Sequence, residues 1–218
     1  SLVCLVGSEM CIRDRCLLCF LIPIITIIIS FVWSANLNLV SWCIPNFEGC
    51  TSISRVGRYE PVKYFFKPLM FIYAVFLYYF WKKYYEFLSK NKINLSKFLK
   101  FMAYCSILFL VLYIFFLGEG KLYRFFRQVG IFIYIFFTVL TQFFFSIKFK
   151  NTLGINVKAK NYLFYYSATI TLLGVLLFPL AISEAEIINN FKNIISWNYF
   201  LLTHLYFILL FFILKKTK

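Results

Sequence analysis

The residues with the clearest chemical potential are basic side chains that lie between long apolar runs. Arg55 and Arg58 are three residues apart, and Lys63 follows them in the same connecting segment. Arg124 and Arg127 repeat this spacing in a second segment, where a short helix would place both on one face. Guanidinium forks match the geometry of phosphate oxygens. These five side chains therefore predict a binding site for a lipid headgroup.

Internal neutralisation is the alternative reading of the same cations. The three connecting segments expected on the outer side also hold the acidic residues Glu48, Glu60, Glu119, Glu184 and Glu186. If the carboxylates pair with the arginines, the charges stabilise the loops and bind no ligand. The sequence leaves both readings open.

Acid–base chemistry has three weak candidates in this chain: Glu119, Glu184 and His204. A general base must lie within hydrogen-bond reach of the proton that it takes, so an enzyme needs such groups at one cavity. A single His in a membrane helix is more often a partner for a neighbouring helix. Zinc hydrolases need several ligands, and no nucleophile or nucleotide-binding fingerprint is found. We therefore expect no metal and no cofactor, and favour a protein without catalytic activity.

Cys43 and Cys50 form a possible disulfide pair. Six residues separate them, including Pro45 and Gly49, so that closure of the loop is sterically reasonable. The pair lies in a segment expected on the non-cytoplasmic side, where disulfides form and persist. Two free thiols are the alternative.

The composition excludes an ordinary soluble domain. Apolar residues make up 62% of the 218 residues and aromatic residues 23%, with a mean hydropathy of +0.82. A soluble globular protein is only about half apolar. The net charge of +15 does not indicate nucleic-acid binding, because the lysines lie between apolar runs. We expect an all-α, polytopic transmembrane helical bundle whose partners are membrane lipids.

Six apolar runs are long enough to cross a bilayer, whose core of about 30 Å needs roughly 20 helical residues. Their continuous apolar character favours helices over the alternating strands of a barrel. The spans are predicted at about residues 16–34, 65–81, 98–117, 130–147, 162–182 and 197–214, in a single domain covering 16–218. Residues 1–15 resemble a translated sequencing-adapter peptide, and we expect them to have no biological role.

The charges between the runs predict the orientation. The segments after the second, fourth and sixth runs hold thirteen basic residues and one acid, whereas the other three connections hold eight basic residues and five acids. Lysine and arginine are retained on the cytoplasmic side, so both termini are predicted in the cytoplasm. The expected location is a bacterial inner membrane. A eukaryotic endomembrane is the alternative, since Lys215, Lys216 and Lys218 also fit a dilysine retrieval pattern.

Several short motifs together suggest a family. The first loop reads Cys43-Ile44-Pro45 and continues through Cys50-Thr51-Ser52-Ile53-Ser54-Arg55 to Gly57-Arg58. Gly118-Glu119-Gly120, Arg127 and Gly130 follow, and the last run opens with Ser196-Trp197-Asn198-Tyr199. From about Cys16 onward the chain resembles the Frag/DRAM/Sfk family of six-span membrane proteins, particularly its uncharacterised bacterial members. The resemblance implies roles in glycolipid-anchor remodelling, phospholipid organisation or autophagy-linked trafficking, and it supplies no catalytic residues.

Three functions follow as hypotheses. The first is a lipid-interacting or membrane-organising protein whose outer basic cluster binds headgroups. The second is a membrane-embedded enzyme that modifies lipids. The third is a small-solute transporter, for which Gly174 and Pro179 in the fifth run are the only hint of a broken helix.

Overall fold

Helices are the only regular elements in the part of the chain that the structure describes. The computed structural model describes residues 8–91, 93, 96–152, 155–182 and 189–215. The elements are α1 (Ser8–Asn36), α2 (Pro45–Glu48), α3 (Ile53–Val56), α4 (Val62–Lys90), α5 (Lys97–Phe115), α6 (Lys121–Phe149), α7 (Val157–Ile182) and α8 (Asn189–Lys215).

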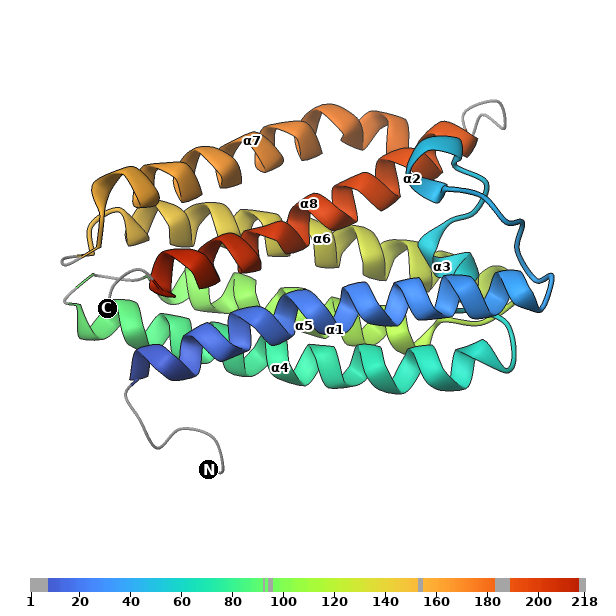
Figure 1. Ribbon diagram of the computed structural model, residues 1–218, viewed down its shortest axis with the longest axis horizontal. Coiled ribbons are helices and arrows are strands. Elements are labelled where there is room, and N and C mark those ends of the chain that lie inside the picture. Colours follow the sequence, from blue (N-terminus) through green and yellow to red (C-terminus); the bar gives the residue numbers. More distant parts are fainter. Residues whose placement is uncertain (1–7, 92, 94–95, 153–154, 183–188, 216–218) are drawn as a thin grey trace.

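The long helices run side by side along one axis, as Figure 1 shows. The start of α1 and the end of α8 lie at the same end of the bundle, and the short helices α2 and α3 lie at the opposite end. Helix α1 packs against α4 and α8, α5 packs against α6, and α7 packs against both α6 and α8. The connection between α1 and α4 and the connection between α5 and α6 therefore lie at the same end of the bundle.

Five helices have the length and apolar character of a membrane span within the described residues. They are Ile12–Asn36, Val62–Lys90, Lys97–Phe115, Lys121–Phe149 and Asn189–Lys215. Large apolar side chains cover their outward surfaces, and Ile28, Leu108 and Phe212 each expose more than half of their area. Such surfaces are stable against lipid tails rather than water. The chain is accordingly an integral membrane protein, and the predicted run at 162–182 lies in α7.

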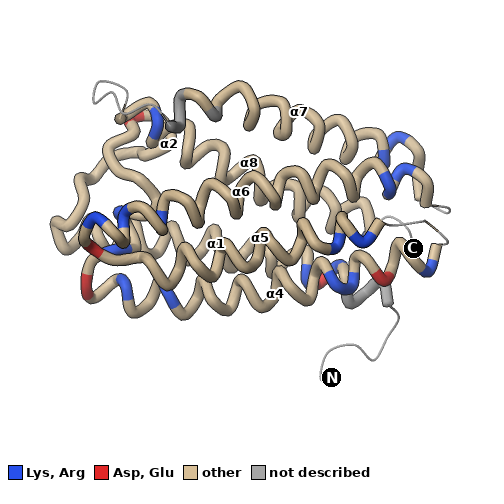
Figure 2. Tube along the Cα trace, turned by 180° about the vertical axis from the view of Figure 1, so that it is seen from behind, with Lys and Arg blue, Asp and Glu red and all other residues tan. Residues whose placement is uncertain are grey.

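Charged residues gather at the two ends of the bundle, as Figure 2 shows for Lys, Arg, Asp and Glu. Several helices continue beyond the predicted apolar runs into these charged ends. Helix α4 extends to Lys90, past Lys82 and Lys83, and α6 begins at Lys121 instead of near Gly130. Arg124 and Arg127 consequently lie on the first turns of α6 itself.

Gly130 allows the close approach of α5 and α6. A Cβ at this position would lie 3.0 Å from the backbone nitrogen of Tyr113 and 3.1 Å from its Cα atom. We expect Gly130→Val to lower stability by about 1–3 kcal/mol, because it overpacks a contact with rigid backbone. Thermal unfolding in detergent measures this loss. Leu108→Val, at a position 62% exposed, is the control. Equal melting temperatures for the two variants would contradict the close packing.

Candidate functional site

A cavity of about 520 Å³ opens where the segment before α4 meets the connection between α5 and α6. Three of the five predicted headgroup residues line it. The lining consists of Arg58, Tyr59, Gly118, Glu119, Gly120, Lys121, Arg124 and Arg127. Four basic side chains thus surround one carboxylate, so the cavity carries an excess of positive charge.

The two innermost arginines hold their charges with few protein partners. Arg127 is only 6% exposed, and its Nη1 atom donates a hydrogen bond to the Gly118 carbonyl oxygen at 2.8 Å. The Nε atom of Arg58 is buried and has no hydrogen-bond partner among the described residues. The Arg58 guanidinium carbon lies 5.9 Å from the centre of the Tyr59 ring. Buried polar groups are normally hydrogen-bonded, so these guanidinium donors favour an anionic ligand.

The described acidic residues at the α2 and α3 end of the bundle bond to groups other than the arginines or form no salt bridge with them. Glu60 accepts hydrogen bonds from Lys63 at 3.0 Å and from Tyr64 at 2.9 Å. The bond from Lys63 is the main cause of a lowered pKa for Glu60. Glu48 accepts a hydrogen bond from the Ile44 backbone at 2.9 Å.

Glu119 lines the cavity, yet it forms no salt bridge with an arginine in the described part of the chain. Glu184 and Glu186 lie outside the described residues. Among the described residues, Glu48, Glu60 and Glu119 therefore form no salt bridge with the arginines, whereas Glu60 neutralises Lys63.

The first turn of α6 adds backbone donors to the cavity. Gly120 is the N-cap of α6 with a φ of +106°, a conformation that favours glycine, and it supplies no side-chain cap. The first N–H groups of a helix have no partner within the helix and attract anions. Gly120, Lys121 and Arg124 all line the cavity, so the start of α6 and the arginines act on the same space.

Exposed apolar side chains lie close in sequence to the residues that line the basic cavity, and Phe115, Leu122 and Phe125 are here called its apolar border. Leu122 exposes 64% of its surface and Phe125 exposes 60%. Phe115, at the end of α5, is 66% exposed. An anion-binding cavity with an apolar border suits an amphipathic ligand better than a small inorganic ion.

Two of the predicted headgroup residues lie elsewhere. Arg55 lines a separate cavity of about 120 Å³ together with Cys50, Thr51 and residues 38–41. Lys63 is paired with Glu60. The larger cavity instead gains Lys121, which follows Glu119 and Gly120 and was not singled out from the sequence.

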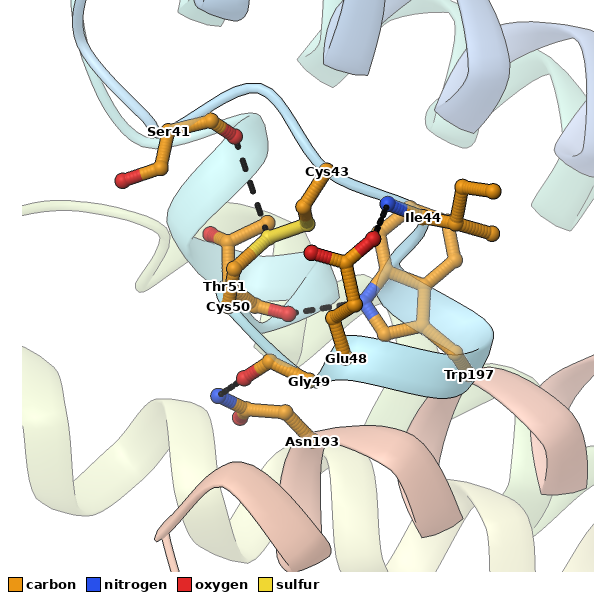
Figure 3. The surroundings of a disulfide bond; sticks show 9 residues. All are labelled: Ser41, Cys43, Ile44, Glu48, Gly49, Cys50, Thr51, Asn193 and Trp197. Atoms are coloured by element: carbon orange, nitrogen blue, oxygen red, sulfur yellow. Dashed lines mark hydrogen bonds between the residues drawn. A yellow bond between two sulfur atoms is a disulfide. The ribbon is translucent and has the colours of Figure 1, made fainter.

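A disulfide and a set of hydrogen bonds fix the loop between α1 and α4 to α8 (Figure 3). Cys43 and Cys50 are joined, with their Cα atoms 6.5 Å apart, and they enclose α2. Hydrogen bonds beside Cys50 reach α8: Asn193 donates to the Gly49 carbonyl at 2.7 Å, and the Trp197 indole donates to the Thr51 carbonyl at 2.8 Å. Asn198 of α8 also donates to the Asn46 carbonyl at 2.9 Å. The loop is therefore held against α8 on both sides of Cys50.

His204 lies in the interior of the bundle and not at the cavity. Its Nε2 atom is 3.1 Å from the Tyr73 hydroxyl, which is 2.9 Å from the Tyr134 hydroxyl. Its Nδ1 atom is 2.8 Å from the Phe200 carbonyl oxygen. The cluster joins α4, α6 and α8, as expected for an interhelical hydrogen-bond partner.

The geometry gives the enzyme hypothesis little support. Of its three candidate residues, Glu119 lines the cavity, His204 is buried in the bundle and Glu184 lies outside the described residues. No group of three potential metal ligands occurs in the part of the chain that the structure describes. Glu119 and His204 are thus not brought together at a described cavity.

Tyr73→Phe tests the interhelical cluster. We expect the loss of both hydroxyl contacts to lower stability by about 1 kcal/mol, since single hydrogen bonds in membrane bundles contribute about 0.6 kcal/mol on average. Thermal unfolding in detergent is the measurement. Tyr78→Phe, on a ring 38% exposed, is the matched control. A variant as stable as this control would show that the cluster adds nothing to helix packing.

Comparisons with known proteins leave the family open. No family model, curated protein or solved structure matches the chain. The resemblance to the Frag/DRAM/Sfk family stays a prediction from short motifs. The function is therefore argued from the cavity alone.

Proposed function

We propose that the chain crosses the membrane six times and keeps both termini in the cytoplasm. Helix α7 supplies the sixth crossing, since it is 26 residues long and packs against α6 and α8. The start of α1 and the end of α8 lie at one end of the bundle, which agrees with an even number of crossings. The lysine-rich segments after α4, α6 and α8 then meet the cytoplasm.

A reporter fused after Lys218 tests this orientation. Alkaline phosphatase is active only outside the cytoplasm, so we expect no activity there and high activity for a sandwich insertion after Glu119. A green fluorescent protein at the same two sites should give the opposite pattern. Phosphatase activity after Lys218 and none after Glu119 would reverse the orientation. Activity at both sites would imply an even number of crossings between them instead of the three supplied by α6, α7 and α8.

We propose that the protein binds the headgroup of an anionic phospholipid in the cavity at the α2 and α3 end, within the outer leaflet. The observation that carries this proposal is the lining of the cavity, where Arg58, Lys121, Arg124 and Arg127 surround the single carboxylate of Glu119. The apolar border formed by Phe115, Leu122 and Phe125 suits the attached acyl chains.

The lipids that remain bound during purification test this function. Protein extracted in mild detergent is analysed by native mass spectrometry, and its lipids are compared with those of the source membrane. We expect anionic phospholipid to be enriched and retained at a ratio near one per chain. Recovery in the proportions of the source membrane would contradict a specific site.

A further inference from the structure

The cavity that binds the proposed headgroup has more positive charge than one phosphodiester can balance. Four basic side chains and one carboxylate leave a formal charge of +3 around the space. A phosphodiester headgroup such as that of phosphatidylglycerol carries one negative charge. A terminal phosphate carries about 1.5 to 2 negative charges at pH 7 and has three strong acceptor oxygens.

The donors are arranged on more than one side of the cavity. Arg58 approaches from the segment before α4, with its buried Nε atom unpartnered among the described residues. Arg127 and Arg124 approach from the first turns of α6, one helical turn apart. The free N–H groups that follow Gly120 add backbone donors. A phosphate with three free oxygens can accept from all three directions, whereas a diester offers two unesterified oxygens.

Burial of the arginines also favours a doubly charged phosphate over a singly charged one. Arg127 is 6% exposed and lines the same cavity as Arg58, so that two like charges share a partly dehydrated space. Bringing charges out of water is costly unless an opposite charge compensates them. A ligand with two negative charges compensates two guanidinium groups, and a ligand with one does not.

We infer that the cavity selects a terminal phosphate, a phosphomonoester or the end of a diphosphate, over a phosphodiester headgroup. This inference rests on the proposed headgroup site and names the class of ligand that the site binds. The ligand chemistry is shared by phosphatidic acid-type lipids and by soluble phosphomonoesters, and the apolar border favours the lipid.

Binding of three lipids and one soluble phosphomonoester to the full chain in nanodiscs tests the inference. The probes are phosphatidic acid, phosphatidylglycerol and phosphatidylcholine with identical acyl chains, and glycerol 3-phosphate as the soluble phosphomonoester. We expect phosphatidic acid to bind about tenfold more tightly than phosphatidylglycerol, the gain from one further charge-assisted hydrogen-bonded contact. Phosphatidylcholine should bind weakest.

Arg124→Gln and Arg55→Gln provide the matched pair of variants. Arg124 is an exposed cavity residue, so its loss should reduce the preference for phosphatidic acid without unfolding the bundle. Arg55 lines the other cavity, and its loss should leave the preference unchanged.

The outcomes separate this inference from the proposed function. Equal affinity for phosphatidic acid and phosphatidylglycerol, both above phosphatidylcholine, overturns the terminal-phosphate preference and leaves the anionic-lipid site standing. Equal affinity for all three lipids overturns both. Glycerol 3-phosphate binding as tightly as phosphatidic acid keeps the terminal phosphate as ligand and removes the lipid as its source.

Discussion

Protein carrying Arg58→Gln and Arg127→Gln together is expected to lose about a hundredfold in affinity for anionic phospholipid, since each hydrogen bond to a charged group contributes about 1.5–3 kcal/mol. Both side chains line the cavity, and Arg127 is its most buried cation. Glutamine keeps an amide donor of moderate length and removes the charge. Lipid binding in nanodiscs or by native mass spectrometry measures the loss.

The controls distinguish lost binding from lost folding. Arg58→Gln alone should reduce affinity about tenfold with an unchanged melting temperature, because its Nε atom has no described protein partner. Arg55→Gln removes an equal charge at the same end of the bundle but outside the cavity, and it should bind lipid normally. Wild-type affinity in the double variant would exclude the cavity as the headgroup site.

The second large effect is expected for the disulfide between Cys43 and Cys50. Replacing both by Ser opens a short loop, whose closure stabilises the folded state by about 2.5 kcal/mol in the chain-entropy description. Helix α2 lies within that loop, and Asn193 and Trp197 hold the loop's end against α8. We therefore expect a lower melting temperature and faster amide hydrogen exchange in residues 43–51.

Cys105→Ser is the matched control, since Cys105 is a free thiol within α5. Its melting temperature and its exchange in residues 43–51 should equal those of the wild type. If the double Cys variant behaves like this control, the hydrogen bonds to α8 alone hold the loop. Treatment of the wild type with a reductant should reproduce the effect of the double variant.

The helices could be predicted because an apolar run long enough to cross the hydrocarbon core indicates a helix surrounded by lipid. The run at 16–34 lies within α1, and the run at 197–214 lies within α8. The run at 98–117 overlaps α5, which ends two residues earlier. Their ends were less predictable. Helix α4 continues to Lys90 and α6 begins at Lys121, since a helix can project into water once its hydrocarbon part is fixed, and charge then no longer marks its end.

The sequence predicted the basic character of the candidate site, but only some of the residues that line it. Arg58, Arg124 and Arg127 meet at one cavity, whereas Arg55 turns to another and Lys63 pairs with Glu60. Residues three apart in an irregular segment diverge or converge according to tertiary packing, which spacing does not encode.

The partners of His204 were hidden for a different reason. The hydroxyls of Tyr73 and Tyr134 lie inside apolar runs that hold many other tyrosines and phenylalanines. Composition alone does not distinguish a buried hydroxyl from one at the membrane surface. Such pairs become visible only when the register of α4, α6 and α8 is fixed.

An experimental structure in nanodiscs that contain phosphatidic acid tests the central claim most directly. The proposed site predicts a lipid phosphate within hydrogen-bond distance of the Arg58 and Arg127 guanidinium groups, with its acyl chains beside Leu122 and Phe125 in the leaflet opposite to the chain's C-terminus. A cavity closed by a salt bridge from Glu119 to these arginines, with the lipid phosphates bound elsewhere, would contradict it.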